Sequence, residues 1–117
     1  MAAEIKTKLG KIVLQEDLIA NIAGYAACEN YGIVGMNSKK AKDTFIEIIK
    51  RDNHKRGIKI NNIQDDTLDI DLFVTLEYGI SLRAVAQNAQ SNVRYRVEEM
   101  TGLKVRNVNI YVESVRV

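Results

Sequence analysis

The residues most able to do chemistry are one thiol, one imidazole and a pair of carboxylates. Cys28 and His54 are the only cysteine and histidine of the chain. They cannot supply the four nitrogen and sulfur ligands of a structural zinc site. His54 lies in a basic stretch without a plausible partner for nucleophilic catalysis. We expect Cys28 to be a small reduced residue on a tightly packed helix.

Asp69 and Asp71 are the carboxylates whose spacing could matter, because residues two apart lie on the same face of a strand. Paired carboxylates can hold Mg²⁺ or Ca²⁺, but this spacing does not match a calcium-loop motif. The aspartates follow Asp65-Asp66, a pair typical of a turn, so solvated surface is the simpler interpretation. The sequence therefore predicts no catalytic residue, no cofactor and no metal site, and we expect a protein that is not an enzyme.

The composition indicates one globular domain over residues 1–117, because 46% of the residues are hydrophobic and 27% are charged. Seventeen basic and 15 acidic residues give a net charge of +2, which excludes a protein that coats nucleic acid by bulk charge. No apolar run approaches the roughly 20 residues of a membrane span, and the N-terminus lacks a secretion signal. We expect a cytoplasmic protein without a transmembrane segment.

The apolar periodicity predicts the element order β-α-β-α-β-β-α-β. The expected strands cover residues 5–14, 33–36, 58–63, 68–77 and 108–117, and the expected helices cover 17–30, 39–52 and 81–101. Within the first of these strands, Leu9-Gly10 is expected to be a break. The strands at 58–63 and 68–77 form a hairpin, and the helix at 81–101 joins two parallel strands. The predicted fold is α+β, with two layers and a mixed β-sheet whose helices pack mainly on one face.

Two details of packing follow from the same patterns. We expect the first helix to bury a stripe of Leu18, Ile22 and Ala26, with Ile19, Ala23 and Tyr25 beside it. We expect the long helix to bury a stripe that runs from Leu82 to Met100. In the last strand the apolar phase shifts by one residue, which predicts a β-bulge near residues 113–114.

Two charged patches are candidate interaction surfaces. Residues 37–60 hold eight basic residues against three acidic ones, whereas residues 64–79 hold five acidic residues and no basic residue. The basic patch could attract the phosphate of a lipid or nucleic acid, or could be the solvated face of a helix. The two patches could also meet head to tail in an assembly. The candidate residues are Lys39, Lys40, Lys42, Lys50, Arg51, Lys55 and Arg56, and Asp65, Asp66, Asp69, Asp71 and the outward-facing Phe73.

A series of short motifs resembles one known family over essentially the whole chain. The motifs are Gly10-Lys-Ile-Val-Leu, Tyr31-Gly-Ile-Val-Gly-Met, Tyr78-Gly, Val85-Ala-Gln-Asn-Ala-Gln, Glu99-Met-Thr-Gly-Leu and Val108-Asn-Ile-Tyr-Val. In this order they resemble the alkaline shock protein family of Gram-positive bacteria, also called the envelope stress response family, and its short members in particular.

The resemblance implies a small, non-enzymatic, cytoplasmic factor in envelope stress or homeostasis that acts by protein–protein interaction. It also implies recruitment to the membrane by a membrane-anchoring protein, and self-association as a homo-oligomer. Some short members are encoded beside a kinase-like protein, which implies a possible partner and a link to lipid metabolism. The residues themselves leave one alternative open, a small nucleic-acid-binding module that uses the basic segment 39–59.

Overall fold

The structure, a computed structural model, describes residues 2–30, 32–33 and 57–117. The strands are β1 (Ala2–Thr7), β2 (Gly10–Gln15), β3 (Ile58–Gln64), β4 (Thr67–Glu77) and β5 (Lys104–Arg116), and the helices are α1 (Glu16–Cys28) and α3 (Leu82–Thr101). The fold is α+β, as the sequence predicts. The expected helix at 39–52 lies outside the described residues, and of the expected strand at 33–36 only Ile33 is described, in an isolated antiparallel bridge with Leu76.

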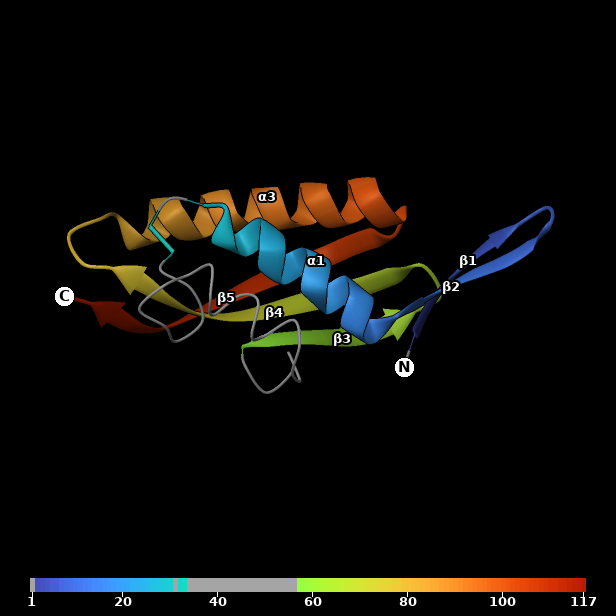
Figure 1. Cartoon of the computed structure of the whole chain (residues 1–117), viewed down its shortest axis with the longest axis horizontal. Coiled ribbons are helices and arrows are strands. Elements are labelled where there is room, and N and C mark those ends of the chain that lie inside the picture. The colour runs from blue at the N-terminus through green and yellow to red at the C-terminus, as the bar shows by residue number, and fades with distance from the viewer. Residues whose placement is uncertain (1, 31, 34–56) are drawn as a thin grey trace.

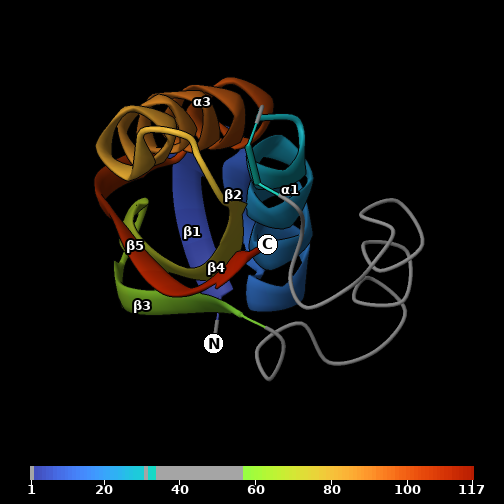
Figure 2. The same cartoon turned by 90° about the vertical axis from the view of Figure 1, so that its left-hand side faces the viewer.

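A mixed three-stranded sheet forms one layer, with the strand order β3-β4-β5. β3 and β4 are antiparallel, and β4 and β5 are parallel and joined by α3. Both α1 and α3 lie on the same face of this sheet (Figures 1 and 2), where α1 packs against β3 and α3 packs against β5. The expected hairpin, parallel pair and one-sided helix layer are thereby confirmed.

β4 supplies the centre of the core because its residues alternate between the two faces of the sheet. The apolar set that faces the helices is at most 1% exposed, namely Leu68, Ile70, Leu72, Val74 and Leu76. The expected bulge is also present, since Val74 pairs with Val112 whereas Thr75 pairs with Ser114. Glu113 is therefore the extra residue of β5.

The packing of α1 differs from the expected stripe. Ile19 and Ala23 are fully buried, whereas Leu18 is 44% exposed, and of the expected stripe only Ala26 is buried. The reason is that α1 contacts both β3 and α3. Its buried side therefore spans more than one stripe, and it consists mainly of small residues that let the helix approach both elements closely. In α3 the stripe is buried in its middle, but Leu82 and Met100 are exposed. Met100 lies at a surface groove between the two helices that Ile22 and Tyr25 of α1 also line.

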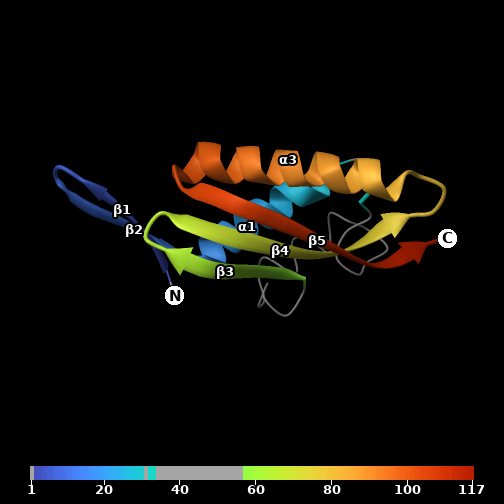
Figure 3. The same cartoon turned by 180° about the vertical axis from the view of Figure 1, so that it is seen from behind.

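The N-terminal segment, expected as one extended element over 5–14 with a break at Leu9-Gly10, forms two strands that turn back close to that break. β1 and β2 form an antiparallel hairpin, in which pairing runs from Ala2–Gln15 to Thr7–Gly10. The hairpin forms a separate two-stranded sheet that projects from the end of the molecule (Figures 1 and 3). In the described part of the chain, no helix is both long enough and apolar enough to cross a bilayer.

Candidate interaction surface

The face of the sheet opposite the helices carries the acidic candidates of β4 and polar or aromatic partners from its neighbours. We call this surface the outer face and define it by Asn61, Asn62, Asp69, Asp71, Phe73, Asn107, Asn109 and Tyr111. No described helix lies over it (Figure 3). Its side chains are joined in pairs and triplets across the three strands, so it has a defined shape.

Asp69 is the centre of the first group on the outer face. Its carboxylate accepts hydrogen bonds from Asn62 Nδ2 at 2.8 Å and from Asn107 Nδ2 at 3.2 Å. Arg106 Nε lies 3.4 Å from Asp69 Oδ1. The Asn62 hydrogen bond is the largest cause that lowers the pKa of Asp69, with help from Asn107 and Arg106 and against the effect of burial. The residue is only 8% exposed, so the expectation that this carboxylate belongs to the solvated surface is wrong.

Asp71 repeats the arrangement two residues along β4. It accepts a hydrogen bond from Asn61 on β3 and another, of 2.9 Å, from Asn109 on β5. Each of the two carboxylates is thus held between carboxamides from both flanking strands. Such shared oxygens are poorly placed to bind a cation, and the described residues contain no group of three or more side chains that could hold a metal ion.

A second bulge explains how Arg106 reaches Asp69. Leu68 pairs with Val105 whereas Asp69 pairs with Asn107, which leaves Arg106 as an extra residue in β5. A bulge bends the strand and re-aims the side chain. The guanidinium group also donates to the backbone oxygen of Asn62, at 2.5 Å, although the two residues are 44 positions apart along the chain. Periodicity within one strand cannot reveal a contact over such a separation.

The aromatic part of the outer face is a stacked pair. The rings of Phe73 and Tyr111 have centroids 4.7 Å apart and planes inclined by 13°. Phe73 therefore faces outward as expected, but Tyr111 covers one side of its ring and is itself 47% exposed. Next to them, the hydroxyl groups of Thr75 and Ser114 are 2.7 Å apart. Tyr111 is a candidate contact residue that was not predicted from the sequence. It is spaced two residues from Asn109 and four from Asn107, and this alternation could have placed it on the same face of β5.

Asp65 and Asp66 have a different role from the two strand aspartates. They form the turn between β3 and β4, where Asp65 has a positive φ of 53°. Their backbone oxygens accept hydrogen bonds from Glu4 N at 2.9 Å and from Lys104 N at 2.7 Å. These two residues therefore tie the turn to β1 and to the start of β5.

The edge of β5 adjoins the outer face and is partly closed by α3. Gln90 Nε2 donates to the backbone oxygen of Val108 at 2.8 Å, and Arg94 donates to that of Arg106 at 2.5 Å. Between α3 and β5 lies a groove of about 540 Å³, lined by polar residues that include Tyr95 and Asn109. A docked segment could continue from the outer face into this groove.

Cys28 is the remaining candidate for chemistry that the structure describes. Burial raises the pKa of the Cys28 thiol to about 11, so the thiolate needed of a nucleophile is scarce at neutral pH. His54 and the seven basic candidates lie outside the described residues, so the head-to-tail pairing of the two charged patches stays a prediction. The basic residues are Lys39, Lys40, Lys42, Lys50, Arg51, Lys55 and Arg56.

Comparison with known proteins places the chain among bacterial relatives. The model of the alkaline shock protein family, which is described as having a cell envelope-related function, matches residues 4–117. The chain is 42% identical over 118 aligned residues to "Uncharacterized protein YloU" of Bacillus subtilis, with 100% of this chain and 98% of the relative covered.

Two further relatives come from Streptococcus and Bacillus. "Uncharacterized protein Spy1614" of Streptococcus pyogenes is 35% identical, with 100% of this chain and 97% of the relative covered. "Uncharacterized protein YqhY" of Bacillus subtilis is 32% identical, with 94% and 80% covered. No solved structure is significantly similar to the chain. The matches agree with the resemblance that the sequence motifs carry.

Proposed function

Since the chain belongs to the alkaline shock protein family, whose function is related to the cell envelope, we propose that it is a non-enzymatic, cytoplasmic envelope factor that acts by protein–protein interaction. The proposed docking surface is the outer face of the sheet. A partner near the membrane binds there, and contacts between copies of the chain add to the assembly.

The fixed arrangement of polar and aromatic side chains on the outer face is the observation that carries the proposal. Asp69 and Asp71 are each held by two carboxamides, and Phe73 and Tyr111 hold each other by stacking. Side chains that are already ordered lose little conformational entropy when a partner binds. An exposed tyrosine beside them suits this role, because its ring adds contact area and its hydroxyl can hydrogen-bond.

The same contacts support a function without catalysis. The oxygens of both strand carboxylates accept hydrogen bonds from neighbouring amides, so neither carboxylate is well placed to move a proton or to bind a metal. The thiol of Cys28 has a pKa raised to about 11 by burial. The two carboxylates thus connect the side chains of the three strands, and the thiol is mostly un-ionised at neutral pH.

Site-specific photo-crosslinking in cells tests the docking surface. A benzophenone amino acid replaces Tyr111, and the matched control replaces Tyr25, which is 60% exposed and lies on α1, on the opposite side of the sheet from the outer face. We expect a defined adduct from position 111 in the membrane fraction and none from position 25. The proposal fails if position 111 gives no adduct, or if both positions give the same products.

Sedimentation tests self-association separately. Contacts between charged surfaces weaken as salt screens them, so we expect the average mass at high protein concentration to fall as salt is raised. A monomer at both low and high salt would refute self-assembly while leaving the heterologous partner open to the crosslinking test.

A further inference from the structure

The apex of the β1–β2 hairpin presents a single apolar side chain to solvent. Leu9 is fully exposed, at 101%, in a two-residue connection between the paired Thr7 and Gly10. The Thr7 hydroxyl oxygen accepts a hydrogen bond from Leu9 N at 3.2 Å, and the same hydroxyl lies 3.3 Å from the backbone oxygen of Gly10, to which it donates. The turn is therefore ordered, and it holds Leu9 at the most distant point of the hairpin.

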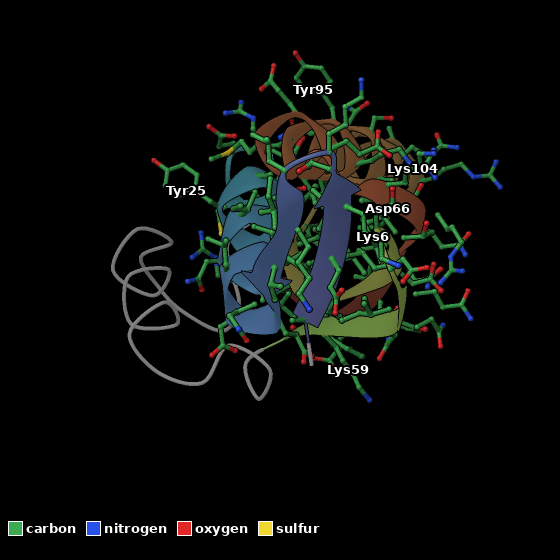
Figure 4. All side chains as sticks on the ribbon, turned by 90° about the vertical axis from the view of Figure 1, so that its right-hand side faces the viewer. Lys6, Tyr25, Lys59, Asp66, Tyr95 and Lys104 are labelled. Carbon is green, nitrogen blue, oxygen red and sulfur yellow. The ribbon has the colours of Figure 1, made fainter. Side chains whose placement is uncertain are left out.

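Lysines surround this apex. Lys8 is beside Leu9 in the turn, and Lys6 and Lys11 are exposed and pair directly across the two strands. Like charges opposite each other destabilise a strand pair, so this arrangement works against the hairpin itself. Glu4 offsets it weakly, because its carboxylate is 3.9 Å from Lys11 Nζ and both side chains are well exposed. Figure 4 views the molecule from the hairpin end and shows Lys6 on it.

We infer that the β1–β2 hairpin is a finger that contacts the surface of an anionic lipid bilayer. The leucine enters the boundary between headgroups and acyl chains, and the three ammonium groups of Lys6, Lys8 and Lys11 lie at the level of the lipid phosphates. The base of the finger is fixed, because Ala3 is fully buried in the core. A nucleic acid would match the lysines but offers no apolar layer for the leucine that extends beyond them.

The expected affinity of the finger for a membrane is low, so its role is to orient the protein. A lysine near an anionic surface changes membrane partition by about fivefold, so three lysines contribute about 100-fold. Burial of one leucine adds about tenfold or more. A single copy then binds only at about millimolar lipid, which orients a protein that another contact keeps at the membrane. The inference thus rests on the proposed envelope role.

Tryptophan fluorescence on the full chain tests the inference. The chain contains no tryptophan, so Leu9→Trp places one reporter at the apex. The matched control is Tyr78→Trp, at a residue that is 71% exposed and follows β4 at the other end of the sheet. With vesicles of equal parts phosphatidylglycerol and phosphatidylcholine, we expect the emission of Leu9→Trp to shift to the blue and that of Tyr78→Trp to stay unchanged. High salt or pure phosphatidylcholine should reduce the shift.

Vesicle sedimentation separates the two contributions. We expect Leu9→Ser to lower partition about tenfold, and alanine at all three lysines to lower it about 100-fold. The inference is overturned if Leu9→Trp shows no shift at millimolar lipid, if both reporters shift equally, or if single-stranded RNA produces the shift and vesicles do not. Crosslinking at Tyr111 is unaffected by any of these outcomes, so the finger and the docking surface can fail independently.

Discussion

Gly32 follows α1, and replacing it with alanine should lower the stability of the fold. Its φ of +93° lies in a region that L-residues rarely adopt. Its backbone oxygen accepts a hydrogen bond of 2.9 Å from Glu77 N. A Cβ added here would lie 2.6 Å from Ile80 Cδ1 and 3.0 Å from Val85 Cγ2. Alanine at position 32 therefore meets both a conformational and a steric penalty.

The two penalties can be separated with a second glycine. Gly79 has a nearly identical φ of +90°, but a Cβ there would meet no atom within 4 Å. Gly79→Ala thus measures the backbone cost alone, about 1–2 kcal/mol. Gly32→Ala adds the displacement of packed side chains, about 1–3 kcal/mol. We expect Gly32→Ala to lower the free energy of unfolding by about 2–5 kcal/mol, a large part of the roughly 5–15 kcal/mol typical of a domain.

Urea unfolding followed by circular dichroism measures both variants against the parent chain. The loss expected for Gly32→Ala corresponds to a fall in Tm of about 4 °C per kcal/mol. If Gly79→Ala destabilises the protein as much as Gly32→Ala does, steric exclusion at position 32 is refuted. If neither variant changes stability, the conformational penalty expected for an L-residue at these positive φ values is refuted as well.

Four further predictions use other parts of the structure. The lowered pKa of Asp69 stabilises the fold above the pKa of an unfolded aspartate, and this contribution is lost as pH falls through the lower folded value. Asp69→Asn should therefore cost about 1 kcal/mol at neutral pH and little in strong acid, as urea unfolding from pH 7 to acid can show. With its pKa near 11 against an ordinary 9.0, Cys28 should react with iodoacetamide at mildly alkaline pH about 100-fold more slowly in the folded chain than in urea. Val93→Ala, at a fully buried residue of α3, should lower the free energy of unfolding by about 2 kcal/mol; a negligible loss would show that this core position is not close-packed. Filter binding should show little RNA affinity, and tight salt-sensitive binding abolished by alanine at Lys55 and Arg56 would favour the nucleic-acid alternative.

The positions that the sequence predicted well are those whose burial depends on one periodicity. The alternation in β4 identified Leu68 and Leu76 as core residues, and both are buried. The middle of α3 followed its pattern in the same way. The stripe of α1 failed because that helix is in contact with two elements at once, and periodicity alone gives a direction for only one contact. Alanines outnumber large residues on its buried side, so hydrophobicity pointed toward Leu18 instead.

The sequence by itself determined the α+β class, the family and the alternation that gives each strand an inner and an outer side. These properties are local, or are carried by the order of short motifs, and neither needs the strands to be paired. Only the tertiary structure decided how the side chains of the outer side are held. Whether Asp69 is solvated or held depends on residues from β3 and β5. The register shift between Asn61 and Gln64 of β3 and the bulge at Arg106 of β5 set which of those residues reach it. Register depends on two segments that are distant in the sequence. The hydrophobic pattern of one strand shows which side is buried, but it does not show which residues of the neighbouring strands lie beside its polar side chains.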